Sequence, residues 1–115
     1  MANKVNTKVV RVVLSNDECK VIEQLGEKYY TSKINQIIKN IVRDEIKDFE
    51  EENKEGIYVV YQEVTEANQE QFVCFDEYTL KIIQNYSKKM NVTTRWFVEY
   101  LLRKKIKSVQ QKGGI

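Results

Sequence analysis

The chain has 115 residues, of which 42% are hydrophobic and 31% are charged, and its formal net charge at pH 7 is +2. This length suits one domain, or two very small units that share a core, and it excludes large multidomain enzymes. The absence of histidine removes the commonest general base and the commonest zinc ligand, so we expect no enzyme and no metal or cofactor site.

The first predicted element is a strand over residues 8–14, a short run rich in β-branched side chains. Alternation along a strand puts one set of side chains on each face. These sets are Val9, Arg11 and Val13 on one face, and Val10, Val12 and Leu14 on the other.

Two helices are predicted to follow this strand. Ser15 and Glu18 have the spacing of a capping box, so the first helix should begin there and end near residues 29–32. Either Thr31 or Ser32 is expected to cap the second helix. Apolar residues at steps of three and four then predict that this helix runs to about Glu52.

The second half of the chain begins with two β-rich runs, residues 57–64 and 70–75, which follow each other closely enough to form a hairpin. Asp76 is a candidate cap for a third helix, and the chain restarts at residues 91–94. The last helix should bury a set of apolar side chains. These are Phe97, Val98, Leu101, Leu102 and Ile106.

The two halves resemble each other. Leu14 and Ser32 are 18 residues apart, as are Phe75 and Thr93, so when Leu14 is laid over Phe75, Ser32 falls over Thr93 and the helical core positions then agree. We therefore divide the chain into a first unit (1–52), a linker that holds the extra β-rich run (53–68) and a second, degenerate unit (69–115).

Charge is distributed unevenly along the chain. Residues 1–14 carry +3 and form a basic N-terminal arm, residues 43–70 carry −7, and residues 81–115 carry +8 and end in a basic tail. Two basic regions that flank an acidic one are able to direct the field of a small protein at a polyanion. The alternative is that these charges are solvated helix faces.

Cys19 and Cys74 lie far apart within apolar segments, which suits reduced core thiols better than a disulfide. No apolar run approaches the roughly 18 residues that cross a bilayer, and no signal-peptide core follows the first residues. We expect a cytoplasmic protein without membrane contact.

Residues 11–18, followed by a helix, the restart at Thr31 and Ser32 and the pair Ile37 and Ile38, resemble the ribbon-helix-helix (MetJ/Arc-type) DNA-binding family. The whole chain is similar to tandem members of that family, in which two units share one polypeptide. The resemblance implies an α+β, mostly helical fold, namely a tandem ribbon-helix-helix with a short antiparallel β-ribbon. A lone unit would expose an unpaired strand edge, so its strand needs a second copy.

A two-stranded ribbon fits the major groove of B-DNA, and Arg11 would point outward at its centre. The expected base-contacting residues are Val9, Arg11 and Val13, with Arg11 on guanine and the valines on thymine methyl groups. The family also anchors phosphates with the N-terminus of its second helix. The expected phosphate-contacting residues are Lys4 and Lys8 in the N-terminal arm, Ser32 and Lys33 in the first unit, and Thr93, Thr94 and Arg95 in the second.

The second unit departs from this pattern, because Glu70, Phe72 and Cys74 would occupy its outward strand positions. An acid and an exposed phenylalanine suit DNA poorly, so we expect that unit to serve in assembly and phosphate binding. Trp96 is expected in the core or at an interface rather than as a platform on which a base stacks.

The resemblance implies sequence-specific binding of double-stranded DNA by a homodimer or higher homo-oligomer. Family roles include transcriptional regulation and plasmid transfer or maintenance, with a relaxase or a toxin as a further partner. The alternative is an antitoxin-like interaction module whose acidic middle, residues 44–70, binds a basic protein.

Overall fold

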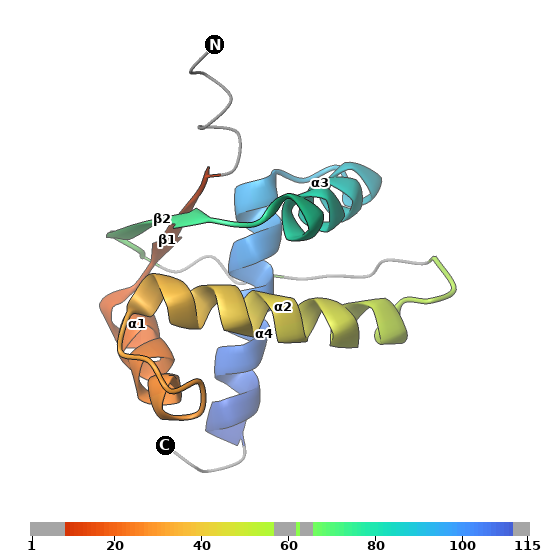
Figure 1. Cartoon of the computed structure of the whole chain (residues 1–115). Coiled ribbons are helices and arrows are strands. Elements are labelled where there is room, and N and C mark those ends of the chain that lie inside the picture. The colour runs from red at the N-terminus through yellow and green to blue at the C-terminus, as the bar shows by residue number, and fades with distance from the viewer. Residues whose placement is uncertain (1–8, 57–61, 63–65, 112–115) are drawn as a thin grey trace.

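The computed structural model describes residues 9–56, 62 and 66–111 (Figure 1). The elements in chain order are β1 (Val9–Leu14), α1 (Asn16–Gln24), the 3-10 helix η2 (Leu25–Glu27), α2 (Ile34–Glu52), β2 (Gln69–Cys74), α3 (Glu77–Met90) and α4 (Thr94–Gln111). The predicted α+β, mostly helical class is confirmed. Within the described residues, each unit consists of one strand followed by helices.

β1 and β2 form a two-stranded antiparallel sheet, so the ribbon is made within one chain. Arg11 lies opposite Phe72 at its centre, and Val9 and Leu14 lie opposite Cys74 and Gln69 at its ends. Strand β2 therefore pairs with β1, some 60 residues earlier in the chain. The strand expected at 57–64 lies outside the described residues except for Gln62, which is in neither a helix nor a strand.

Two of the predicted helix caps are confirmed. The Ser15 hydroxyl accepts a hydrogen bond from the Glu18 N–H at 3.1 Å, and the Glu18 carboxylate accepts one from the Ser15 N–H at 2.8 Å. The Asp76 side chain accepts a hydrogen bond from the Thr79 N–H at 3.2 Å and so caps α3. Each side chain occupies N–H groups that the first helical turn leaves without partners.

The cap predicted for α2 is wrong by one or two residues. Lys33 precedes the helix, and its side chain makes no capping hydrogen bond. Its ψ of 115° is still extended, so helical geometry begins only at Ile34. The Thr31 hydroxyl instead accepts a hydrogen bond from the Lys33 N–H at 3.2 Å, within the connection itself.

The structure repeats in detail after 61 positions. Tyr30 and Asn91 both adopt the left-handed conformation, with φ of 57° and 59°. The next residue in each unit closes the same turn, since Thr31 N–H donates to Gly26 O at 3.1 Å and Val92 N–H donates to Ser87 O at 2.9 Å. This bond pattern is a common way to end a helix. The predicted internal duplication therefore extends to backbone conformation.

Gly26 shows where the two turns differ. A Cβ atom at Gly26 would lie 2.4 Å from the carbonyl oxygen of Thr31, so this turn accepts only glycine without moving. Its counterpart Ser87 carries a side chain and lies within a longer helix, because α3 continues to Met90 whereas α1 ends at Gln24. The second turn therefore accommodates a side chain at the position where the first requires glycine.

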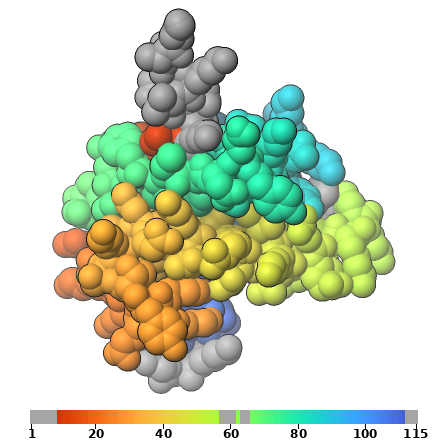
Figure 2. Space-filling view, viewed as in Figure 1, coloured from red at the N-terminus to blue at the C-terminus, as the bar shows by residue number. Residues whose placement is uncertain are grey.

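The two units share one core. Phe49 of α2 packs edge-on against Phe97 of α4, with ring centroids 5.1 Å apart, and against Tyr86 of α3 at the same distance. Helices α2 and α4 cross where they touch (Figure 1). In the space-filling view, β2 and α3 form a continuous surface with α2 (Figure 2). The predicted apolar positions of α4, from Phe97 to Ile106, are all buried.

Both cysteines are unpaired, as expected, but only Cys19 is buried. Cys74 is exposed because β2 turns this position away from the core. The prediction of a core thiol at Cys74 is therefore wrong. None of the helices within the described parts of the chain has the length and apolar character to cross a membrane.

Candidate nucleic-acid interface

One face of the β1–β2 ribbon is turned away from the helices. The side chains of Val10, Val12 and Val73 point into the core and are almost fully buried. The opposite face carries exposed side chains from both strands, namely Val9, Arg11, Glu70, Phe72 and Cys74. The outward positions predicted for Val9, Arg11 and all three β2 residues are confirmed. We call this set of five the outer ribbon face.

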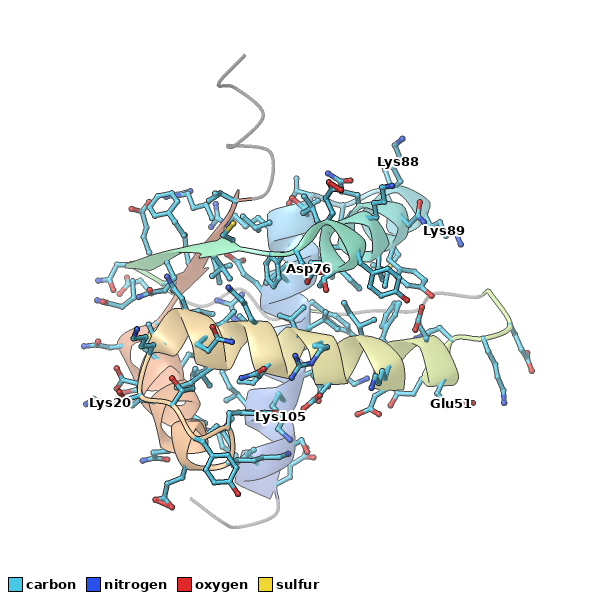
Figure 3. All side chains as sticks on the ribbon, in the orientation of Figure 1. Lys20, Glu51, Asp76, Lys88, Lys89 and Lys105 are labelled. Atoms are coloured by element: carbon cyan, nitrogen blue, oxygen red, sulfur yellow. The ribbon has the colours of Figure 1, made fainter. Side chains whose placement is uncertain are left out.

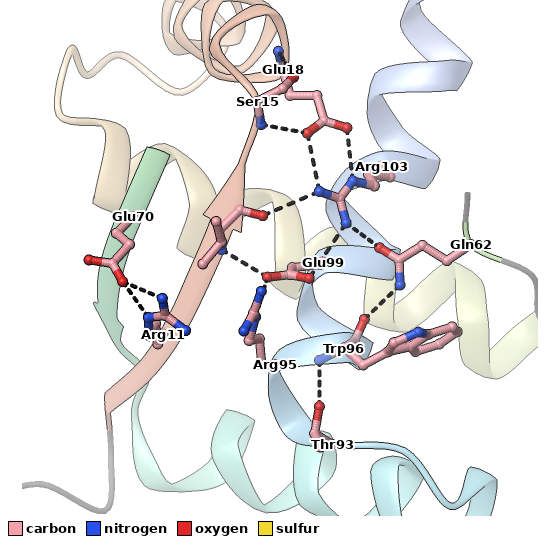
Figure 4. A network of polar contacts seen from close by, with 11 residues as sticks. Arg11, Ser15, Glu18, Gln62, Glu70, Thr93, Arg95, Trp96, Glu99 and Arg103 are labelled. Atoms are coloured by element: carbon pink, nitrogen blue, oxygen red, sulfur yellow. Dashed lines mark hydrogen bonds and ion pairs between the residues drawn. The ribbon is translucent and has the colours of Figure 1, made fainter. Parts of the chain in front are cut away.

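Arg11 forms an ion pair with Glu70 across the ribbon (Figure 4). Both side chains keep almost half of their surface exposed, 47% for Arg11 and 45% for Glu70. An ion pair with this much solvent contact contributes little to the free energy of folding, because water screens both charges. Arg11 is therefore able to exchange this partner for another anion or acceptor at small cost.

Val13 is the exception on this face, with only 6% of its surface exposed. Its N–H donates to the Glu99 carboxylate at 2.8 Å, and its carbonyl oxygen accepts from Arg103 at 3.2 Å. Helix α4 therefore lies against the free edge of β1 and covers Val13. The expectation that Val13 is exposed beside Arg11 is wrong, because the alternation of a strand does not reveal what packs against its edge.

A polar network ties α4 to the first unit (Figure 4). Arg103 donates to both carboxylate oxygens of Glu18, at 2.8 and 3.2 Å, and to the side-chain oxygen of Gln62 at 2.6 Å. Burial by itself would raise the pKa of Glu18, but the hydrogen bonds from Arg103 and from the Ser15 N–H outweigh it and lower that pKa. Glu18 thus serves both as the capping-box acid and as a partner of α4.

The N-termini of α2 and α4 lie at opposite edges of the ribbon. The Asn35 side chain at the start of α2 donates to the carbonyl oxygen of Phe72 at 3.2 Å, and Glu99 near the start of α4 binds the N–H of Val13. The predicted phosphate-contacting residues that precede or begin these two helices therefore flank the ribbon. Ser32, Lys33, Thr93 and Arg95 are exposed, and Thr94 is half-buried.

The side chains of Thr93 and Arg95 have partners within the chain. Thr93 caps α4, since its hydroxyl accepts from the Trp96 N–H at 3.0 Å. Arg95 pairs with Glu99 at 2.8 Å, yet 45% of the Arg95 side chain stays exposed. Lys4 and Lys8 lie outside the described residues. The contact from Asn35 to the ribbon carries no recognisable signal in the sequence.

An open hollow of about 560 Å³ lies between α3 and the start of α4, and Lys81, Lys88 and Thr94 are among its lining residues. Lys88 and its neighbour Lys89 project from the end of α3 into solvent (Figure 3). Lys88 and Lys89 complement the helix dipole there. The net charge of this region is evident from the sequence, but the approach of Lys81 and Lys88 to the start of α4 depends on the tertiary structure.

One face of the Trp96 ring is occupied within the chain. Its indole already stacks on Tyr100, with ring centroids 5.6 Å apart and planes 6° from parallel. Its carbonyl oxygen accepts a hydrogen bond from Gln62 at 3.1 Å, so this residue also holds the linker. The preference for a packing role at Trp96 agrees with these contacts.

Comparison of the chain with family models, with curated proteins and with solved structures finds no match.

Proposed function

We propose that this chain binds double-stranded DNA sequence-specifically by inserting the outer ribbon face into the major groove. The observation that carries the proposal is the antiparallel ribbon, which presents Arg11 at its centre and is flanked at both edges by helix N-termini. A two-stranded ribbon has the width of the major groove, and arginine makes the commonest specific contact there, to guanine O6 and N7. These features agree with the resemblance to ribbon-helix-helix proteins.

The residues around the ribbon fit a division between base and phosphate contacts. Arg11, Val9 and Phe72 would face base edges, while Lys33 and Arg95 would approach the phosphates on either side. A helix N-terminus favours an anion at the same places, because the helix dipole is positive there and the first turn has N–H groups without helical partners. The phosphate contacts supply affinity without sequence preference, and the base contacts supply specificity.

The biological role that we propose follows the resemblance. It is that of a transcriptional regulator or of an accessory protein in plasmid transfer or maintenance. In such a role several chains would associate on neighbouring sites, and a relaxase or a toxin would be the protein partner.

The antitoxin-like alternative has less support. It requires the acidic segment to be available to a basic partner, but several of its acids already have partners in the chain. Asp44 accepts from Tyr29 at 2.8 Å, Glu50 accepts from Tyr86 at 3.0 Å, and Glu52 pairs with Lys104. These three acidic residues therefore have partners within the folded chain.

Substitution of Arg11 tests the proposal. The measurement is fluorescence anisotropy with duplex DNA from the region upstream of the gene, at about 50 mM and about 200 mM salt. We expect binding that weakens with salt, and we expect Arg11→Ala to lose about 1–3 kcal/mol of binding free energy on the preferred sequence. Binding to unrelated sequences should change little.

Lys20→Ala is the matched control, because it removes one positive charge from the exposed side of α1 (Figure 3). The proposal fails if no duplex binds at the lower salt concentration. It also fails if the two variants lose the same affinity, since a general charge effect would then explain both.

A further inference from the structure

The register of the ribbon locates the axis that relates the two units. Arg11 and Phe72 lie directly opposite each other and are 61 positions apart. The same separation relates the caps Ser15 and Asp76 and the left-handed residues Tyr30 and Asn91. The local twofold axis therefore passes between Arg11 and Phe72, at the centre of the outer ribbon face.

Side chains at equivalent positions around this axis differ in chemistry. At the centre, an arginine on β1 corresponds to a phenylalanine on β2. One step outward, Val9 corresponds to Glu70, again 61 positions apart. A ribbon formed by two identical chains would present the same side chains to both half-sites. This ribbon cannot do so, because both strands belong to one chain and differ.

The exposed chemistry is divided between two halves of the face. One half holds the ion pair of Arg11 and Glu70. The equivalent positions in the other half hold Phe72 and Val9, which are apolar and 56% and 39% exposed. The difference continues to the edge of the ribbon, where Val13 is buried while its counterpart Cys74 is exposed.

The edges differ because the helices beside them differ. Glu99 and Arg103 bind the backbone of Val13 at the free edge of β1. Their counterparts in the first unit, 61 positions earlier, are the buried apolar residues Ile38 and Val42, which offer no such polar contact. The two halves of the interface therefore differ both in their exposed side chains and in the helix residues that lie beside them.

We infer that one chain recognises one asymmetric, non-palindromic DNA site, with a guanine on the Arg11 side and thymines on the Phe72 and Val9 side. Arginine donates two hydrogen bonds to guanine in the major groove, whereas apolar side chains contact the thymine methyl group. The inference rests on the proposed function and adds its substrate class. A site of this kind has a direction, so the bound chain has a single orientation on the duplex.

Selection from a randomised duplex pool with the full chain tests this inference. We expect an enriched sequence without inverted symmetry, occupied by one chain per site in native mass spectrometry. Two symmetrised duplexes, each with one half of the selected site repeated as an inverted copy, should bind at least about fivefold more weakly than the selected site.

A palindromic consensus that is occupied by two chains would overturn the inference but leave the proposed function standing. Failure to enrich any sequence from the pool, together with no binding at low salt, would overturn the proposed function itself.

A change at the centre of the ribbon gives a second, independent readout. Phe72→Arg would place an arginine on both sides of the local axis, so it should shift preference toward the symmetrised site that carries the guanine half twice. Phe72→Ala is the control and should weaken binding to the selected site without that shift. Because Phe72 is exposed, both variants should retain the circular dichroism spectrum of the parent chain. Unchanged relative affinities in the Phe72→Arg variant would refute the inference.

Discussion

At the scale of single residues, the Arg11–Glu70 pair governs how the outer ribbon face meets an anion. The pair is half exposed, so separating it costs at most about 1 kcal/mol. Glu70 also places a negative charge on a face that we propose lies between phosphate-lined walls. It therefore opposes binding both by holding Arg11 and by electrostatic repulsion.

We predict that Glu70→Gln strengthens DNA binding by up to about fivefold, because about 1 kcal/mol corresponds to that factor in an equilibrium constant. Anisotropy titrations at low salt measure this change. Glu51→Gln is the matched control, since Glu51 also forms an exposed ion pair, with Lys54, at the far end of α2 (Figure 3). An equal gain in both variants, or a loss at Glu70, would contradict the role assigned to this residue.

At the scale of elements, α4 holds the first unit through Arg103. This side chain and that of Glu18 are only 17% and 16% exposed, and Glu99 beside them is 9% exposed. Removing the guanidinium would leave the Glu18 carboxylate largely out of water without its cation, whereas Glu99 would keep its ion pair with Arg95. A mostly buried charge that loses its partner destabilises a protein far more than a surface charge does.

We predict that Arg103→Met lowers the free energy of unfolding at pH 7 by about 2–4 kcal/mol, measured by urea denaturation. Lys107→Met removes an exposed charge one turn further along α4 and should cost less than about 0.5 kcal/mol. Adding Glu18→Gln to Arg103→Met should recover part of the loss. Additive effects of these two substitutions would show that the pair is not coupled.

The same pair predicts how stability depends on pH. The pKa of Glu18 is lowered from its ordinary value of 4.5, so its ionised form is favoured in the folded chain. The contribution of ionised Glu18 to the free energy of unfolding is therefore complete above about pH 4.5, and it is lost as the pH falls through the depressed pKa. The difference between the parent chain and Arg103→Met should shrink over that acidic range, and a constant difference would exclude this explanation.

At the scale of the whole molecule, one chain completes its own ribbon and its own core. One edge of β1 pairs with β2, and its other edge lies against α4. Phe49 of the first unit packs among aromatic rings of the second unit. Neither unit buries its apolar face without the other. Folding should therefore depend on a single chain and proceed as one cooperative step.

We predict one thermal transition whose midpoint stays constant over about a hundredfold range of protein concentration, as calorimetry or circular dichroism would measure. A fold that requires a second subunit becomes more stable as concentration rises, because association is linked to folding by mass action. A rising midpoint would show that a second chain is part of the folded unit. Two separate transitions would show that the units fold independently.

Local patterns in the sequence determined the features that depend on residues close together. Ser15 and Glu18 form the predicted capping box, α2 ends at Glu52 as expected, and Arg11 faces outward because the side chains of a strand alternate. The duplication was also visible, since the core positions of the helices repeat at one fixed separation.

Only the tertiary structure decided the features that depend on residues far apart. β1 pairs with a strand some 60 residues away, α4 covers Val13, Glu70 binds Arg11, and Cys74 lies on the surface. Helix caps and strand alternation depend on the geometry of a few neighbouring residues, and these residues can be identified from the sequence alone. The partner of a strand edge, and the burial of a side chain beside it, depend on which distant surfaces meet when the two units close around a common core.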